Sequence, residues 1–196
     1  AYREILASNA EEFQRLARMV SDMLFLAKAE HGLALPHREA ISLEREVQAL
    51  FDFYDAVADE KTIRLRLNGH AEVAGDRLMI RRAISNLLSN AVRHAPAESE
   101  IEVTIAGDGG ATTVRVSNAG PPIDAAQLAR LFDRFYRVDK SRAHPQSDGT
   151  GLGLSITRAI MVAHGGMVSA STGNGRITFC LRFSGQPARE RATIGH

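Results

Sequence analysis

The stretch SDGTGLGLSI, residues 147–156, places glycines at alternate positions, Gly149, Gly151 and Gly153, directly before an amphipathic helical pattern. A glycine inside a helix costs about 1 kcal/mol relative to alanine, so three of them at one helix start need a compensating role. One interpretation is a flexible loop followed by an N-terminal cap. The other is an anion that approaches the backbone closely and is held by the unpaired N–H groups of the first helical turn. The stretch alone leaves both interpretations open.

The composition is that of an ordinary globular protein. The chain has 196 residues, of which 44% are hydrophobic and 24% are charged, enough for one substantial core or for a domain with an appendage. The net charge of +1 gives no reason to expect nucleic-acid binding. No apolar stretch approaches the ~20 residues that span a bilayer, and the N-terminus lacks the pattern of a signal peptide.

Cysteine and histidine usage argues against disulfide and zinc frameworks. The single cysteine, Cys180, lies in a strand-like run and is expected in the core, and it allows no internal disulfide. The seven histidines show no spacing suited to a zinc site. We therefore expect a reduced compartment and no structural metal.

Residues 2–30 are predicted to form a coiled-coil or bundle helix with an apolar stripe. A lone helix cannot bury such a stripe, so its partner is expected to be missing from this chain or supplied by another copy. The stripe repeats at heptad spacing and consists of Leu6, Phe13, Val20 and Ala27, with Leu16 and Met23 at the second heptad position.

The remaining patterns predict an α+β domain. Its helices are expected to pack on one face of a mixed, mostly antiparallel sheet, and a long bundle helix precedes it. Repeated βαβ units are missing, which argues against a dinucleotide-binding interpretation of the glycines. Helices are predicted over 43–61, 76–95, 125–132 and 152–166, and strands over 62–69, 100–118 and 167–183, the last two ranges each holding two strands joined by a turn.

The predicted organisation has four parts. Residues 1–31 form the first helix as a partial domain, and residues 32–40, which include Gly32 and Pro36, form a linker. Residues 41–184 form the main domain and residues 185–196 a disordered tail. Within the domain, the polar stretch 136–151 is expected to be a mobile lid.

Asn86, Asn90 and Arg93 share one face of the helix predicted over 76–95. Asparagine is mildly unfavourable in mid-helix and is usually placed there by a polar task. The two amides could simply cap neighbouring elements. Alternatively, Asn90 offers a hard carbonyl oxygen to Mg²⁺ while Arg93 pairs with phosphate oxygen.

Four short motifs follow one another along the chain. Their order and spacing together carry a resemblance that is far more specific than any one motif alone. They resemble the N, G1, F and G2 boxes of the ATP-binding domain of sensor histidine kinases. The N-terminal helix is similar to the second helix of the dimerisation and phosphotransfer hairpin. The chain is most similar to heavy-metal sensor kinases, of the copper or cobalt–zinc–cadmium type. The motifs are NLLSNAVRHAP (86–96), VSNAGPPI (116–123), LFDRFYRVD (131–139) and GTGLGLSI (149–156).

The resemblance implies a Bergerat-type ATP-binding fold that holds ATP and Mg²⁺. It places Asn90 as the Mg²⁺ ligand, Asn86 and Arg93 against the phosphates, and Arg137 toward the γ-phosphate. It also implies that Asn118 accepts a hydrogen bond from the adenine amine. The remaining nucleotide contacts it implies are Gly120, which keeps the backbone close to the base, Ile123 in the adenine pocket, and Gly149, Thr150, Gly151, Leu152 and Gly153 around the triphosphate.

Two positions depart from the family pattern. Asn118 stands where the family usually has aspartate, and Pro122 stands where a second glycine is usual. An amide oxygen can still accept from the adenine amine, but it brings no charge and can rotate. We therefore expect a pocket that is altered rather than abolished.

None of the seven histidines has the His-Glu-x-x-Thr-Pro pattern of a phosphoacceptor. The resemblance thus implies a catalytic part, beginning after the phosphoacceptor helix, of a kinase that is anchored in a bacterial inner membrane through upstream segments. It would phosphorylate a histidine outside this chain for relay to a response regulator, and would dimerise through its first helix. One alternative is an ATPase of the same superfold, although Asn86 stands where such enzymes need a glutamate base. Another is a scaffold without nucleotide.

Overall fold

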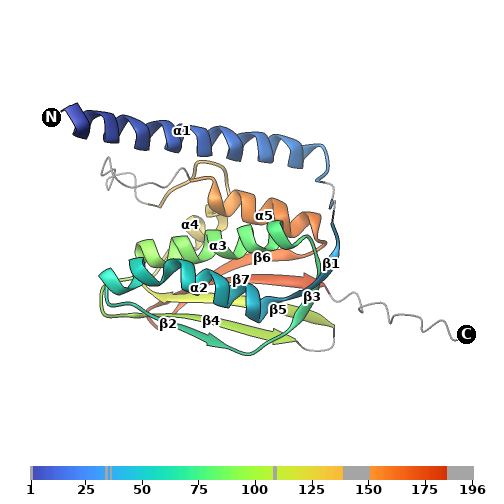
Figure 1. Ribbon diagram of the computed structural model, residues 1–196. Helices are drawn as coiled ribbons and strands as arrows, with labels where there is room; N and C mark the ends of the chain where they lie inside the picture. Colours follow the sequence, from blue (N-terminus) through green and yellow to red (C-terminus); the bar gives the residue numbers. More distant parts are fainter. Residues whose placement is uncertain (1, 34, 36, 108–109, 139–150, 185–196) are drawn as a thin grey trace, which may run out of the picture.

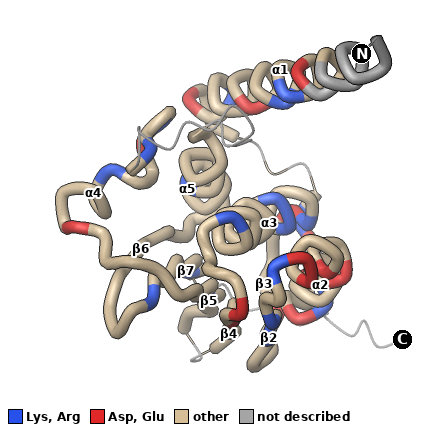
Figure 2. The backbone as a smooth tube through the Cα atoms, turned by 90° about the vertical axis from the view of Figure 1, so that its left-hand side faces the viewer, with Lys and Arg blue, Asp and Glu red and all other residues tan. Residues whose placement is uncertain are grey.

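The computed structural model describes residues 2–33, 35, 37–107, 110–138 and 151–184. It confirms the α+β prediction: the helices lie on one face of a sheet, and the long first helix lies above them (Figure 1). Seen along the helices, α5, α3 and α2 stand side by side over the sheet (Figure 2). The helices are α1 (Tyr2–Glu30), α2 (Leu43–Glu60), α3 (Arg77–His94), α4 (Ala125–Arg130) and α5 (Gly153–Ala163).

The main sheet has five strands in the order β2-β4-β5-β7-β6. Its β2–β4 pair is parallel and its other pairs are antiparallel, as expected for a mixed, mostly antiparallel sheet. The strands are β2 (Arg64–Asn68), β4 (Glu100–Gly107), β5 (Ala111–Ala119), β6 (Met167–Gly173) and β7 (Arg176–Ser184).

A second, two-stranded sheet was not predicted from the sequence. It pairs β1 (Glu39–Ser42) with β3 (Glu72–Gly75) in antiparallel register. Each strand has only four residues, too few for a clear alternating pattern, and β1 begins inside the predicted linker 32–40. This small sheet fixes the entries into α2 and α3, which follow its two strands directly.

Side-chain caps open helices α2, α3 and α4. Ser42 accepts from the backbone N–H of Arg45 at 3.5 Å, and Asp76 accepts from that of Met79 at 3.0 Å. Asp124 forms a reciprocal capping box with its N3 residue. Helix α5 differs, because its N-cap residue, Leu152, makes no side-chain capping bond.

The core lies between the sheet and helices α2, α3 and α5. Alternate residues of β7 face it, from Ile177 to Phe183, and are at most 8% exposed. Cys180 points to the other face of the sheet and is half-buried, so the expectation that it fills the core was wrong. In α2, Val57 is 46% exposed and Ala58 is buried, so the buried face of this helix ends on Ala58.

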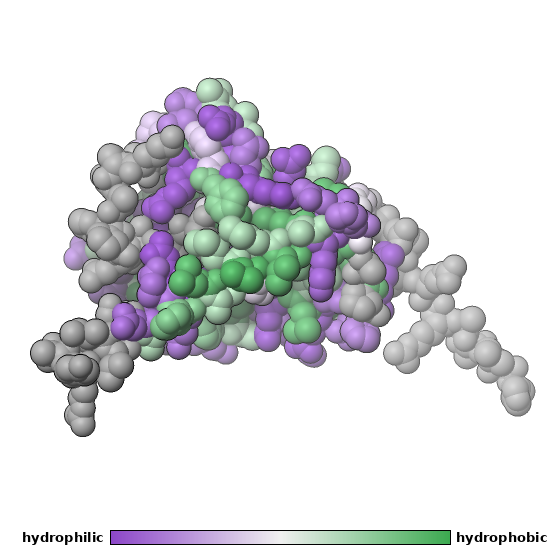
Figure 3. Space-filling view, turned by 90° about the horizontal axis from the view of Figure 1, so that it is seen from above, coloured by the Kyte–Doolittle hydropathy of each residue, from purple (hydrophilic) through white to green (hydrophobic). Residues whose placement is uncertain are grey.

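Helix α1 packs on the domain with one face only. Leu26 is buried, and Met19 and Phe25 pack partly against the core. Two ion pairs join α1 to the domain: Asp22 with Arg82 of α3, and Glu30 with Arg134 at 2.7 Å. The opposite face holds the predicted heptad stripe, and the view from above shows its hydrophobic residues at the surface (Figure 3). Its exposed members include Phe13, Leu16, Val20 and Met23. In the described part of the chain, no helix is both long and apolar enough to cross a membrane.

Candidate nucleotide site

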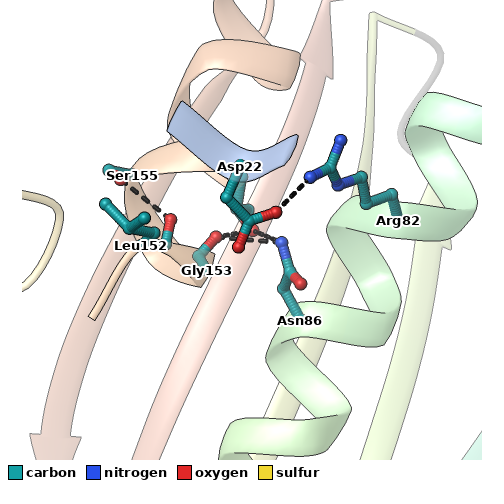
Figure 4. Close-up of polar contacts among 7 residues, drawn as sticks. Asp22, Arg82, Asn86, Leu152, Gly153 and Ser155 are labelled. Atoms are coloured by element: carbon teal, nitrogen blue, oxygen red, sulfur yellow. Dashed lines mark hydrogen bonds and ion pairs between the residues drawn. The ribbon is translucent and has the colours of Figure 1, made fainter. Parts of the chain in front are cut away.

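Helices α3 and α5 run antiparallel and are joined by side-chain contacts at both ends. At one end, the backbone N–H of Asp76 donates to Nε2 of His164 at 3.0 Å. At the other end, Nδ2 of Asn86 donates to the carbonyl of Gly153 at 2.9 Å. The second contact brings the two predicted motifs, the asparagine helix and the glycine-led helix, directly together (Figure 4).

The contact of Asn86 is part of a small polar cluster. Its Nδ2 also lies 3.4 Å from Oγ1 of Thr157, and that hydroxyl donates to the Gly153 carbonyl at 2.9 Å. Thr157 is fully buried. Thr157 was not predicted from the sequence, because a threonine inside an apolar helix is interpreted as a core residue. Its contact with Asn86 depends on how the neighbouring helix α3 packs.

The glycine turn that leads into α5 is shaped by its packing on Phe135. Gly151 has a φ of 71°, a left-handed conformation that glycine adopts without strain. A Cβ on Gly151 would come within 3.1 Å of the backbone of Phe135, whose N–H donates to the Gly151 carbonyl at 3.1 Å. Gly149 and Thr150 lie outside the described residues, as does most of the predicted lid.

Asn90 and Arg93 follow Asn86 along the same face of α3. Asn90 is half-buried, and Arg93 is exposed in the last turn. Nζ of Lys61 donates to the carbonyls of Val92 at 2.9 Å and of Arg93 at 3.2 Å, which fixes the end of α3 that carries both residues. Arg137 is exposed on the segment after α4. The role of Lys61 was not predicted, because its distance along the chain from Arg93 hides their contact.

Asn118 lies at the same end of the molecule, opposite Ile101 at the start of β4. It is 2% exposed, and its Nδ2 donates to the carbonyl of Ala119 at 2.8 Å. A Cβ on Gly120 would come within 2.9 Å of Cδ1 of Ile177, so a larger residue at this position would have to displace that side chain. Ile123 packs partly against the core beside this region.

These residues fit a magnesium–nucleotide complex. The first turn of α5, with its N–H groups uncapped by a side chain, is the kind of helix start that binds phosphate. The amide of Asn90 offers the hard oxygen that Mg²⁺ prefers, and Mg²⁺ needs few protein ligands because it keeps several waters.

Named relatives of the chain are sensor kinases. It is 46% identical over 170 residues to the sensor histidine kinase CusS of Escherichia coli K12, a match that covers 86% of this chain and 35% of CusS. It is 37% identical over 197 aligned positions to the sensor protein CzcS of Cupriavidus metallidurans, covering 99% of this chain and 41% of CzcS. The chain thus spans about a third to two fifths of the length of these relatives.

The fold is that of solved histidine kinases. The structure of the Acinetobacter baumannii histidine kinase AdeS matches with a TM-score of 0.77 at 22% identity, over 91% of this chain and 83% of that one. The family model described as histidine kinase-, DNA gyrase B-, and HSP90-like ATPase matches residues 75–186, which include α3, the glycine turn and α5. The resemblance to heavy-metal sensor histidine kinases is confirmed. The chain belongs to the histidine kinase-, DNA gyrase B- and HSP90-like ATPase family.

Proposed function

We propose that this chain is the ATP-binding catalytic part of a sensor histidine kinase. It binds ATP with Mg²⁺ and transfers the γ-phosphate to a histidine that is not among its own seven. The observation that carries the proposal is the meeting of α3 and α5, where the asparagine face of one helix contacts the uncapped, glycine-led start of the other.

Each residue of the site has a distinct task. The N–H groups at the start of α5 receive the phosphates, and Arg93 and Arg137 neutralise their charge. Asn90 would hold Mg²⁺, and the metal would supply positive charge that offsets the charge developing during transfer. Asn118 accepts from the adenine amine, with Gly120 and Ile123 around the base.

The relatives suggest the wider context. CusS and CzcS are named sensor proteins, so we place this chain in a bacterial inner-membrane sensor of heavy metals, with the catalytic domain in the cytoplasm. The phosphoryl group would pass from the histidine to an aspartate of a response regulator. A nucleotide titration separates this function from a scaffold without nucleotide.

We also propose a homodimer through α1. The exposed stripe of Phe13, Leu16, Val20 and Met23 faces away from the domain, so α1 can hold the domain and a second helix at once. Sedimentation equilibrium of the chain and of Val20→Asp tests this. A chain that is monomeric at every concentration contradicts the dimer.

The kinase function is tested with γ-labelled ATP and Mg²⁺. The chain alone should stay unlabelled, whereas an added hairpin that carries the acceptor histidine should gain acid-labile label. Strong acid-labile labelling of the chain itself would contradict a histidine outside it. Release of free phosphate without any labelled protein would favour the ATPase alternative.

A further inference from the structure

We infer that Asn86 is a positioning residue, which together with Thr157 holds the Gly153 carbonyl and so sets the first turn of α5. This inference rests on the proposed function, because that turn is where the phosphates would bind. It changes the role that family resemblance gives Asn86, which is direct contact with the phosphates, and it gives Thr157 a role that the sequence does not suggest.

The three groups form one closed cluster. The Gly153 carbonyl accepts from Asn86 at 2.9 Å and from Thr157 at 2.9 Å, and the two side chains are themselves 3.4 Å apart. The hydroxyl of Thr157 is fully buried, where an unmatched polar group is costly. A Cβ on Gly153 would lie 3.6 Å from the Asn86 side chain, so the two helices are in van der Waals contact here.

The hydrogen-bonding capacity of asparagine limits what else Asn86 can do. A side-chain amide has two N–H donors on its nitrogen, and its oxygen only accepts. Nδ2 of Asn86 faces both acceptors of the cluster, the Gly153 carbonyl and the Thr157 hydroxyl. Its oxygen cannot bond a phosphate oxygen, because both are acceptors. While the cluster is intact, Asn86 therefore keeps at most one N–H for a phosphate.

Among the described residues, the side chains that bond the start of α5 donate to its carbonyls. Ser155 donates its hydroxyl to the Leu152 carbonyl at 2.8 Å, and Asn86 donates to that of Gly153 (Figure 4). Thr157 donates to the same Gly153 carbonyl. In α3, by contrast, the Asp76 side chain takes up a first-turn N–H. The cluster thus holds the α5 turn in place and leaves its N–H groups for a ligand.

Asn86 also joins this turn to the metal-binding helix. Asn90 stands one helical turn further along α3, on the same face. A bond from Asn86 to the start of α5 therefore fixes the separation between the Asn90 amide and the first-turn N–H groups. A bound magnesium–phosphate group needs the Asn90 amide and the first-turn N–H groups at the same time. The cluster therefore raises the affinity for the phosphates by holding these groups at a fixed separation.

A double-mutant cycle tests the inference through the affinity for ADP with Mg²⁺, measured by calorimetry on the whole chain. Asn86→Ala and Thr157→Val should each weaken binding about fivefold, the size of one neutral hydrogen bond. Because both break the same cluster, the double variant should also be about fivefold weaker, whereas independent losses would multiply to about 25-fold. Thr157→Ser, which keeps the hydroxyl, should bind within about twofold of the unmodified chain.

Two controls separate positioning from a general loss of structure. Ser155→Ala removes a hydroxyl from the same turn but not from the cluster, so its effect should multiply with that of Asn86→Ala. Adenosine, which has no phosphate, should bind all variants within about twofold of the unmodified chain. Multiplicative losses for Asn86 and Thr157, or equal losses for adenosine and ADP, overturn the positioning role alone. An unmodified chain that binds no ADP overturns the proposed function, and this role with it.

Discussion

The two ends of the α3–α5 helix pair differ in how the helix that begins there is capped. At the closed end, formed by Gly75, Asp76 and His164, the polar groups satisfy one another: the Asp76 N–H donates to His164, and the Asp76 carboxylate caps α3. At the open end, formed by Asn86, Asn90, Asn118 and the first turn of α5, the helix start has no side-chain cap. The same pair of helices is therefore joined at both ends, by Asp76 and His164 at one and by Asn86 and Gly153 at the other, but only α3 begins with a side-chain cap.

The imidazole at the closed end has a partner at each ring nitrogen. Nε2 of His164 accepts from the Asp76 N–H at 3.0 Å, and Nδ1 donates to the Ile160 carbonyl at 2.8 Å. The ring fills the space beside Gly75. Its two bonds leave no polar atom of the ring for a ligand, which is the clearest contrast with the open end.

The largest effect is expected from Asn90→Ala at the open end. It removes the proposed Mg²⁺ oxygen from a half-buried position without cutting into the core. Transfer of label to an added acceptor hairpin should fall by about three orders of magnitude, because metal clamping and positioning supply most phosphoryl-transfer catalysis. The melting temperature should stay close to that of the unmodified chain. A loss of only two- or threefold would show that Asn90 is not the ligand.

At the closed end, Gly75→Ala should affect stability and leave nucleotide binding alone. A Cβ there would lie 2.6 Å from the His164 ring and 2.7 Å from Ile80, and the ring is held by two hydrogen bonds. We expect the free energy of unfolding to fall by about 2 kcal/mol, as for other overpacked sites.

Gly173→Ala is the matched control for that change, because a Cβ at Gly173 meets no atom within 4 Å. Urea unfolding measures both variants. ADP affinity, measured where the variant is folded, should stay within about twofold of the unmodified chain, since packing strain at this end lies outside the site. A tenfold loss of ADP affinity in Gly75→Ala would mean that the two ends are not independent.

A glycine in the left-handed conformation lies at each end of α5, and the pair allows the open and closed ends to be compared directly. Gly151 and Gly165 have φ values of 71° and 66°, so alanine at either position costs about 1–2 kcal/mol of backbone strain. Only at Gly151 would the added Cβ also press on Phe135, at 3.1 Å, whereas it meets nothing within 4 Å at Gly165.

ADP affinity should therefore fall about fivefold in Gly151→Ala and stay unchanged in Gly165→Ala, although both variants lose stability. Calorimetric titration beside thermal unfolding measures the pair. Equal losses of affinity would show that the turn at Gly151 does not shape the site.

The sequence predicts the open end better than the closed end. The amphipathic periods of α3 and α5 and the glycine-led start of α5 are local patterns, and each was recognised. The β1–β3 sheet was not predicted, because each of its strands has only four residues and the two strands lie far apart in the sequence.

Partners that are far apart in the chain could not be predicted from sequence. His164 was considered only as a phosphoacceptor, whose sequence pattern it lacks, and nothing local shows that it contacts Asp76, 88 residues away. Asn86 was placed against the phosphates by resemblance, and its contact with Gly153 depends on how α3 and α5 pack. Sequence patterns identify which residues gather at a site, whereas the division of tasks among them follows from packing.

The smallest effect is expected from Asn118→Asp. This variant tests whether the side-chain amide of Asn118 can rotate and so exchange the positions of its oxygen and nitrogen. An amide that rotated could accept a hydrogen bond from adenine or donate one to the carbonyl of guanine. The carboxylate of Asn118→Asp can only accept, so it would then select adenine over guanine more strongly. In the structure, however, Nδ2 of Asn118 is held by the Ala119 carbonyl at 2.8 Å. Turning the amide would place two carbonyl oxygens together, so the unmodified chain should already behave as a fixed acceptor.

Asn118→Asp should therefore raise the preference for ADP over GDP by no more than about twofold. A carboxylate also loses the bond to Ala119 and must be buried, and these costs offset the stronger bond that a charged acceptor makes to the adenine amine. ADP affinity should consequently change by less than about threefold. Calorimetric titration of ADP and GDP against both proteins measures the ratio, and Asn118→Ala, which removes donor and acceptor alike, shows how much of it this residue supplies. A tenfold rise in the ratio for Asn118→Asp would mean that the amide turns freely and that the Ala119 carbonyl does not hold it.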